Sequence, residues 1–156
     1  MNGTPEEVAK SLALAITKIA IRDNRKCFLI SFSTEVETLN LTDPKMAMID
    51  LIPFLSHSFN GGTDAEPAME QALKMLKSKD YEKADVIMVS DFVMDSFGSG
   101  LSLAIKSAKK NKTKFHSLVI DNSHNEKVME EFDTNWIYND EGYPNTITLL
   151  KNKIKI

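Results

Sequence analysis

The apolar run at residues 86–89, Val-Ile-Met-Val, constrains the fold of this chain more than any other feature. Ser90 and Asp91 follow it at once. Four adjacent apolar residues are typical of a strand that is covered on both faces. A sheet with helices on both sides provides that cover, and it is the usual arrangement of parallel sheets in α/β proteins. The run therefore predicts a central strand between two layers of helices.

Strand and helix patterns alternate along the rest of the chain. Further strands are predicted at residues 27–32, 36–41, 115–120 and 136–138, and helices at 8–21, 44–52, 64–76, 101–108 and 126–132. This alternation predicts an α/β, Rossmann-like, doubly wound fold with a mainly parallel sheet. The helix at 8–21 is apolar on almost every side, so we expect it to be unusually buried.

The composition is that of one soluble domain. The chain has 156 residues, 42% of them apolar, and no linker or repeat divides it, so we predict a single domain over residues 1–156. A net charge of -3 gives no general basic surface for nucleic acid. No apolar run reaches the roughly 20 residues of a membrane span, and the start lacks the pattern of a signal peptide. These features predict a cytoplasmic protein. Residues 146–156 are either a basic helix or a tail.

Two polar positions lie where an α/β sheet usually binds ligands, beyond the carboxyl ends of its strands. Asp91 follows the apolar run, and Thr63 follows Gly61 and Gly62 just before a predicted helix. A carboxylate and a hydroxyl are oxygen ligands of the kind that Mg²⁺ or Mn²⁺ prefers. The simpler alternative is that Thr63 or Asp64 only caps the helix and Asp91 only begins a loop.

Other catalytic schemes have weaker support in the sequence. No glycine-rich phosphate loop is present, and residues 97–100, Phe-Gly-Ser-Gly, lack the first glycine of a nucleophile elbow. The three histidines have no metal-ligand spacing, and His116 lies inside a predicted strand, where packing or exposure is its simpler role. Cys27 lies in an apolar strand, which favours an inert buried thiol.

The segments around both polar positions resemble those of a known family. Residues 60–64, Asn-Gly-Gly-Thr-Asp, and residues 86–92, Val-Ile-Met-Val-Ser-Asp-Phe, are similar to the second and third loops of a von Willebrand factor A (VWA) domain. The resemblance covers nearly the whole chain. It implies a VWA fold with a metal-ion-dependent adhesion site (MIDAS), in which Thr63 and Asp91 are the second and third ligand elements.

A narrower resemblance suggests the kind of partner. Residues 24–27, 32–35, 61–64 and 89–92 look like the corresponding segments of VWA proteins that pair with a MoxR-type AAA+ ATPase. The resemblance therefore implies a protein-binding module in such a system, not an enzyme. Two alternatives remain open: a small flavodoxin-like or hydrolase-like α/β enzyme that uses Asp91 at the sheet edge, and a structural domain without a metal.

One element of the family pattern is missing. The family carries a D-x-S-x-S motif just before its first helix, whereas this chain begins at Met1 directly before the predicted helix. The resemblance implies that the chain starts just after that motif, without the first central strand and three of the five usual metal-site residues. Mg²⁺ or Mn²⁺ would then be held in the intact parent and only weakly, or not at all, by this chain.

The missing strand would leave residues 27–32 and 86–89 without a neighbour between them. Unpaired buried backbone groups are rarely tolerated, and an open apolar edge invites pairing with another chain. We therefore expect the gap to close, either by direct parallel pairing of these two strands or by self-association between copies of the chain.

Overall fold

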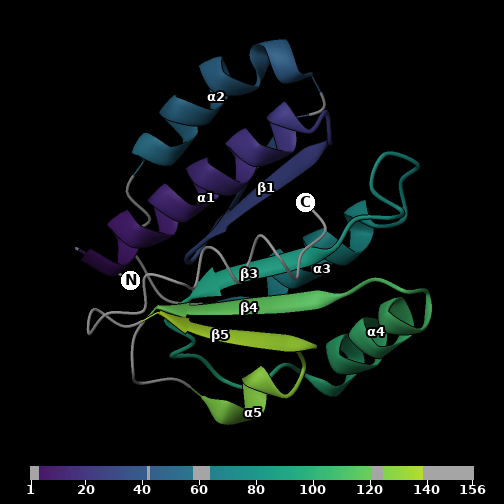
Figure 1. Cartoon of the computed structure of the whole chain (residues 1–156). Coiled ribbons are helices and arrows are strands. Elements are labelled where there is room, and N and C mark those ends of the chain that lie inside the picture. The colour runs from purple at the N-terminus through teal and green to yellow at the C-terminus, as the bar shows by residue number, and fades with distance from the viewer. Residues whose placement is uncertain (1–3, 42, 58–63, 121–124, 139–156) are drawn as a thin grey trace.

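The computed structural model describes residues 4–41, 43–57, 64–120 and 125–138 (Figure 1). Its elements in chain order are α1 Thr4–Arg22, β1 Cys27–Phe32, β2 Val36–Leu41, α2 Pro44–Ser56, α3 Glu66–Met75, β3 Val86–Ser90, α4 Ser99–Lys110, β4 Phe115–Ile120, α5 Glu126–Met129 and β5 Thr134–Tyr138. The predicted alternation of strands and helices is confirmed. No helix among these residues is both long enough and apolar enough to cross a membrane.

A three-stranded parallel sheet in the order β3-β4-β5 forms the centre of the molecule. Every residue of the middle strand β4 is buried. On one face, Leu118 of β4 packs with Leu12 of α1. On the other face, Val119 belongs to a cluster that includes Met69 of α3 and Ile105 of α4. Helices therefore cover both faces of a parallel sheet, which confirms the predicted α/β, Rossmann-like class.

A second sheet consists of β1 and β2, which pair antiparallel with Cys27 opposite Leu41 and Phe32 opposite Val36. The three residues between the strands form the hairpin turn. Leu41 packs against Leu51 of α2, and both side chains are fully or almost fully buried. This sheet lies beside the edge of the parallel sheet that ends in β3 (Figure 1).

β1 and β3 run in the same direction but do not pair. The backbone N–H of Asp64, just before α3, donates to the carbonyl oxygen of Ser33 just after β1, at 3.2 Å. After α3, the hydroxyl of Tyr81 reaches the carbonyl oxygen of Cys27 at the start of β1, at 3.1 Å. α3 thus runs back along β1, and β3 then returns beside it (Figure 1).

The expected direct pairing of residues 27–32 with residues 86–89 is wrong. The two strands belong to different sheets, and a cavity of about 350 Å³ is lined by both of them and by α1 and α3. Residues of α1 and of α3 line this cavity together with the two strands, so the cavity separates the strand edges. Self-association between copies stays a prediction.

The expectation that the helix at 8–21 is unusually buried is also wrong. Within α1, only Leu12, Thr17 and Ala20 are buried among the side chains that the structure describes, and most of the others are half-buried. The cause is the cavity, since Ala9, Ala13 and other apolar side chains of α1 line it.

Candidate binding site at the carboxyl edge of the sheet

Asp91 lies directly after β3, at the carboxyl end of the parallel sheet, as the sequence predicts. Its side chain is half-buried. Its Oδ1 atom accepts a hydrogen bond from the backbone N–H of Val93 at 3.3 Å and one from the hydroxyl of Ser90 at 3.3 Å. An aspartate that binds the backbone two residues ahead forms a local turn. The carboxylate is therefore held in one place at the rim of the sheet.

Phe92 fixes the backbone beside this carboxylate. Its φ angle is 55°, a left-handed conformation that a bulky residue adopts only when its surroundings impose it. Its ring is fully buried and meets the ring of Phe132 edge to face, with centroids 5.6 Å apart. Its N–H donates to the hydroxyl oxygen of Ser90 at 3.1 Å. Burial of the ring thus maintains the strained turn that presents Asp91.

Asn125 holds the same loop from the other side. Its backbone N–H donates to the carbonyl oxygen of Phe92 at 3.0 Å, and its side-chain amide donates to the carbonyl oxygen of Met94 at 3.0 Å. The Asn125 Oδ1 atom also caps α5 by accepting from the N–H of Lys127 at 3.1 Å. Sequence reasoning missed both Phe92 and Asn125 as supporting residues. A possible signal was the capping pattern of Asn125 followed by Glu126.

Thr63, the second predicted ligand, lies outside the described residues, so its approach to Asp91 stays a prediction. The next residue, Asp64, lies at the end of β1, where its N–H binds Ser33. Its Oδ1 accepts from the N–H of Glu66 at 3.3 Å, while Ala65 occupies the N-cap position of α3 without a side-chain cap. Asp64 was expected to be the N-cap residue of this helix. Ala65 takes that position instead, one residue later, while the Asp64 side chain binds the N–H of Glu66.

The start of α3 is also joined to the start of α4. The carboxylate of Glu66 accepts a hydrogen bond from the N–H of Gly98, the N-cap residue of α4. The segment that follows Thr63 and the loop that follows Asp91 therefore meet at the same edge of the molecule. Val93, in that loop, is an apolar residue with 57% of its surface exposed.

The described residues offer few side chains that could bind a metal ion together. Among them, no group of three or more histidine, cysteine, aspartate or glutamate side chains could hold an ion. Asp91 alone is an incomplete donor set for Mg²⁺, which needs several well-placed oxygens.

The remaining sequence candidates lie away from this edge. His116 is buried in β4 and stacks on Trp136, with centroids 5.3 Å apart. His57 is exposed and lies 3.7 Å from the carboxylate of Glu37, and His124 lies outside the described residues. Burial raises the pKa of the Cys27 thiol, consistent with an inert side chain.

The loop containing residues 97–100 does not form a nucleophile elbow. Such an elbow places a serine on a sharp turn directly between a strand and a helix. Here Ser99 begins α4, while β3 already ends at Ser90, and Phe97 packs into the core.

Comparison with known proteins shows that most of the chain is similar to a regulatory protein. The chain is 32% identical over 137 residues to "Regulatory protein ViaA" of Proteus mirabilis (strain HI4320). The match covers 87% of this chain but only 28% of that relative, so the chain spans less than a third of its length. No protein-family model matches the chain.

Proposed function

Because most of the chain is similar to a protein named as regulatory, we propose that it is a protein-binding module of the VWA type that acts in regulation. The similarity to ViaA over 87% of the chain is the observation that carries the proposal. The order of the segments at residues 61–64 and 89–92 supports it, since both border the edge at which an α/β sheet binds ligands. In this role the chain is not an enzyme, and its place is the cytoplasm.

The proposed contact surface is the carboxyl edge around Asp91. A half-buried carboxylate in a fixed turn, next to the exposed apolar side chain of Val93, provides both a polar and an apolar contact. Polar groups of this kind give a protein interface its specificity, and the apolar contact contributes binding energy.

A divalent cation belongs to this proposal with Thr63 and Asp91 as its ligands, Mg²⁺ or Mn²⁺ being the ions that suit them. The donor set among the described residues does not fit such an ion by itself, because no three or more histidine, cysteine, aspartate or glutamate side chains among them are grouped so that they could hold a metal. We therefore propose that the residues of this edge bind the partner protein. The cation would be bound in the intact parent protein.

The proposed partner is a MoxR-type AAA+ ATPase. The test is the affinity of this chain for the MoxR-type ATPase of the same organism, measured by calorimetry with and without Mg²⁺. Asp91→Ala should weaken binding by at least about tenfold, equivalent to about 1.4 kcal/mol.

Asp95→Ala is the matched control, because Asp95 is an exposed carboxylate in the same loop. It should leave the affinity unchanged. If the two substitutions weaken binding equally, the carboxyl edge around Asp91 is not the contact surface. If the wild-type chain does not bind the ATPase, the proposed partner is wrong.

A further inference from the structure

The amino edge of the parallel sheet, where its strands begin, carries a basic surface in a chain that is acidic overall. Two connections meet there, residues 76–85 before β3 and residues 110–114 before β4. They lie side by side because the first residue of β3 pairs with the first residue of β4 (Figure 1). The connections hold six exposed lysines and only three acidic residues. We call the six the amino-edge lysines: Lys77, Lys79, Lys83, Lys110, Lys112 and Lys114.

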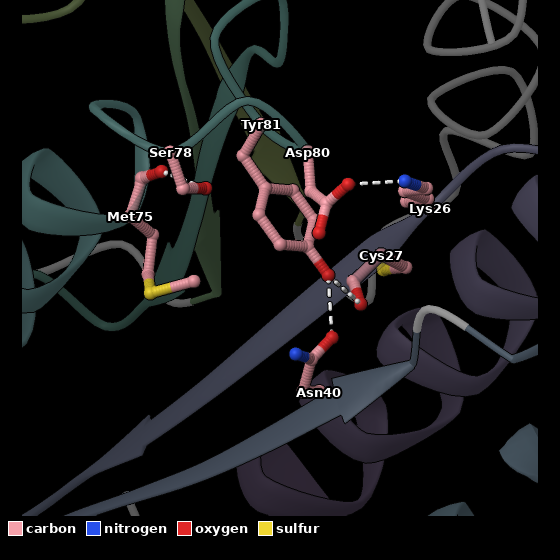
Figure 2. A network of polar contacts seen from close by, with 7 residues as sticks. All are labelled: Lys26, Cys27, Asn40, Met75, Ser78, Asp80 and Tyr81. Carbon is pink, nitrogen blue, oxygen red and sulfur yellow. Dashed lines mark hydrogen bonds and ion pairs between the residues drawn. The ribbon is translucent and has the colours of Figure 1, made fainter.

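Two of the three acidic side chains of these connections already have partners in the fold. Asp80 forms an ion pair with Lys26 (Figure 2). Asp85 accepts a hydrogen bond from the backbone N–H of Lys114 at 3.0 Å. Among the described residues, none of the amino-edge lysines forms an ion pair. Their ammonium groups therefore face the solvent without a counter-charge bound to them from the fold.

Buried contacts hold the longer connection in one place. The ring of Tyr81 is buried, and its hydroxyl lies 3.1 Å from the carbonyl oxygen of Cys27 and 2.6 Å from Oδ1 of Asn40 (Figure 2). The hydroxyl of Ser78 donates to the carbonyl oxygen of Met75 at 2.8 Å (Figure 2). The lysines on either side of Tyr81 therefore extend from a fixed backbone, which reduces the entropy that is lost when a ligand binds.

Lys112 occupies a backbone position that favours glycine. It follows Asn111, the C-cap residue of α4, and its φ angle is 72°. Glycine is the usual residue at such a helix end, because any other side chain strains the left-handed backbone. The N–H of Lys112 donates to the carbonyl oxygen of Lys109 at 2.9 Å, a bond that glycine would make equally well. Helix capping therefore gives no reason for a lysine here, and the outlier points to a function of its side chain.

The negative ends of the helix dipoles do not account for the amino-edge lysines. The attraction of a helix end for positive charge is confined to its last turn. α3 ends at Met75 and α4 ends at Lys110. Four of the six lysines lie beyond the capping residues of both helices: Lys79, Lys83, Lys112 and Lys114.

We propose that the amino-edge lysines form an interaction surface for an acidic segment of a partner protein. Carboxylates of that segment supply the counter-charges that the fold leaves out. The surface lies where β3 begins, whereas Asp91 lies where β3 ends. The proposal therefore goes beyond the proposed function and does not depend on it.

The composition of the surface favours a polypeptide over a nucleic acid or a membrane. Residues 74–114 contain nine lysines and no arginine, the residue that binds phosphate by a planar two-point contact. No large apolar side chain is exposed in either connection, so neither offers a ring for base stacking or an anchor for a bilayer. The net charge of -3 opposes the approach of an extended polyanion, whereas a short acidic segment meets only the local positive field.

A second copy of this chain fits the surface less well. Its carboxyl edge, at residues 64–66 and 91–98, does carry four acidic residues and no basic one. Three of these carboxylates already accept backbone hydrogen bonds: Asp64 from Glu66, Glu66 from Gly98 and Asp91 from Val93. An extended acidic segment has its carboxylates free for the lysines.

Fluorescently labelled hexaglutamate is the probe, and fluorescence anisotropy gives its dissociation constant for the whole chain. Amide chemical shifts in NMR locate it. They should change in residues 76–85 and 110–114 and stay constant in residues 91–95. Changes confined to residues 91–95, or no binding, would overturn the proposal. An uncharged glycine–serine peptide of the same length should not bind, and equal binding of it would also overturn the proposal.

Lys83→Glu and Lys112→Glu change one lysine in each connection. Each should weaken hexaglutamate binding by at least about threefold, and the two together by about tenfold. Lys127→Glu is the matched control, because it makes the same change of charge at an exposed lysine outside both connections. It should leave the dissociation constant within about twofold of the wild-type value. An equal loss in all three single variants would show that binding follows net charge alone, and the surface would be wrong.

Lys112→Gly separates binding from stability. Glycine relieves the left-handed backbone, so this variant should unfold at a denaturant concentration no lower than that of the wild type. It should still bind hexaglutamate at least about threefold more weakly. Wild-type affinity in this variant would contradict the function inferred for the Lys112 side chain.

Two more measurements separate the acidic segment from other occupants. Hexathymidylate and vesicles that contain phosphatidylglycerol should bind more weakly than hexaglutamate. Tighter binding of either would make a nucleic acid or a membrane the partner and overturn the proposal. Sedimentation over a range of protein concentrations should give the same result for the wild type and Lys112→Glu. Association that Lys112→Glu abolishes would make a second copy the occupant instead.

Discussion

At the scale of single residues, His116 combines deep burial with unsatisfied polar atoms. Only 3% of its surface is exposed, and neither ring nitrogen has a hydrogen-bond partner among the described residues. Burial disfavours the charged ring and lowers the pKa of His116 below its ordinary value of 6.5, although Asp85 and Asp133 oppose this shift and Lys114 adds to it. The folded state therefore holds the ring neutral.

This burial predicts an acid-dependent loss of stability. Because the pKa is lower in the folded state than in the unfolded state, the unfolded chain binds the proton more readily. Stability should be complete above about pH 6.5 and should fall as the pH drops through the folded-state pKa. His116→Phe keeps a ring against Trp136 and should lose this part of the pH dependence in denaturant titrations. His57→Gln, at an exposed position, should retain it, and identical profiles for all three proteins would contradict the prediction.

Tyr81 predicts an effect at the alkaline end. Burial raises the pKa of Tyr81 to about 12, so its stabilising contribution is present below about pH 10 and is lost as the pH rises toward 12. Tyr81→Phe should remove this loss and cost about 1 kcal/mol at neutral pH, since the hydroxyl contacts with Asn40 and Cys27 disappear. Asn40→Ala and the double variant complete a mutant cycle. Strict additivity of the two substitutions would mean that the contact contributes nothing.

Asp91 also carries a prediction about metal binding. We expect no tight Mg²⁺ site in this chain, because one carboxylate and the hydroxyl of Thr63 would leave the ion most of its water. Calorimetry with Mg²⁺ and Mn²⁺ measures this directly. A site of micromolar affinity that disappears in Asp91→Ala would contradict the expectation.

The sequence predicted the position of Asp91 and missed what holds it. The position of Asp91 at the sheet edge follows from the apolar strand directly before it, because this inference needs only the local sequence pattern. The positive φ angle of Phe92 and the bonds from Asn125 depend on packing between segments more than 30 residues apart in the chain. No local pattern encodes such contacts.

At the scale of elements, the junction of α3 and α4 depends on one carboxylate. Glu66 accepts from the N–H of Gly98 at the positive end of α4, where negative charge is favourable. Glu66→Ala should cost about 1 kcal/mol in the free energy of unfolding, and Glu66→Gln less, because the amide keeps an acceptor. Glu70→Ala, at an exposed position of α3, is the control and should change little. Equal costs for Glu66→Ala and Glu70→Ala would exclude the junction as a source of stability.

α1 shows why helix burial was overestimated. Its apolar residues on almost every side predicted cover on every side. The pattern correctly predicted that the surface of α1 is apolar. The spacing of apolar residues, however, does not show whether another helix or strand packs against that surface. The cavity side of α1 carries the apolar residues of a covered helix and borders the open space between β1 and β3.

At the scale of the whole molecule, the predicted α/β class with a mainly parallel sheet was correct, and the direct pairing of residues 27–32 with residues 86–89 was not. Local patterns identify strands and helices, and alternation then gives the class. Pairing between strands is a long-range property, and residues 27–32 and 86–89 have the same apolar character whether they pair or stand apart. The two separate sheets therefore could not be read from the sequence.

These two sheets predict a distinct pattern of amide hydrogen exchange. β4 pairs on both edges and is wholly buried, so nearly all its amides are bonded and should be protected to a similar degree. Among the described residues, β1 and β3 each pair on one edge only, and successive N–H groups of a strand point to opposite sides. Every second amide in these strands should therefore exchange faster than its neighbours, by at least about tenfold. NMR-detected exchange of the chain measures this directly, with β4 as the internal reference. Uniform protection along both β1 and β3 would mean that the cavity edges are already paired in solution, which the separate sheets do not allow.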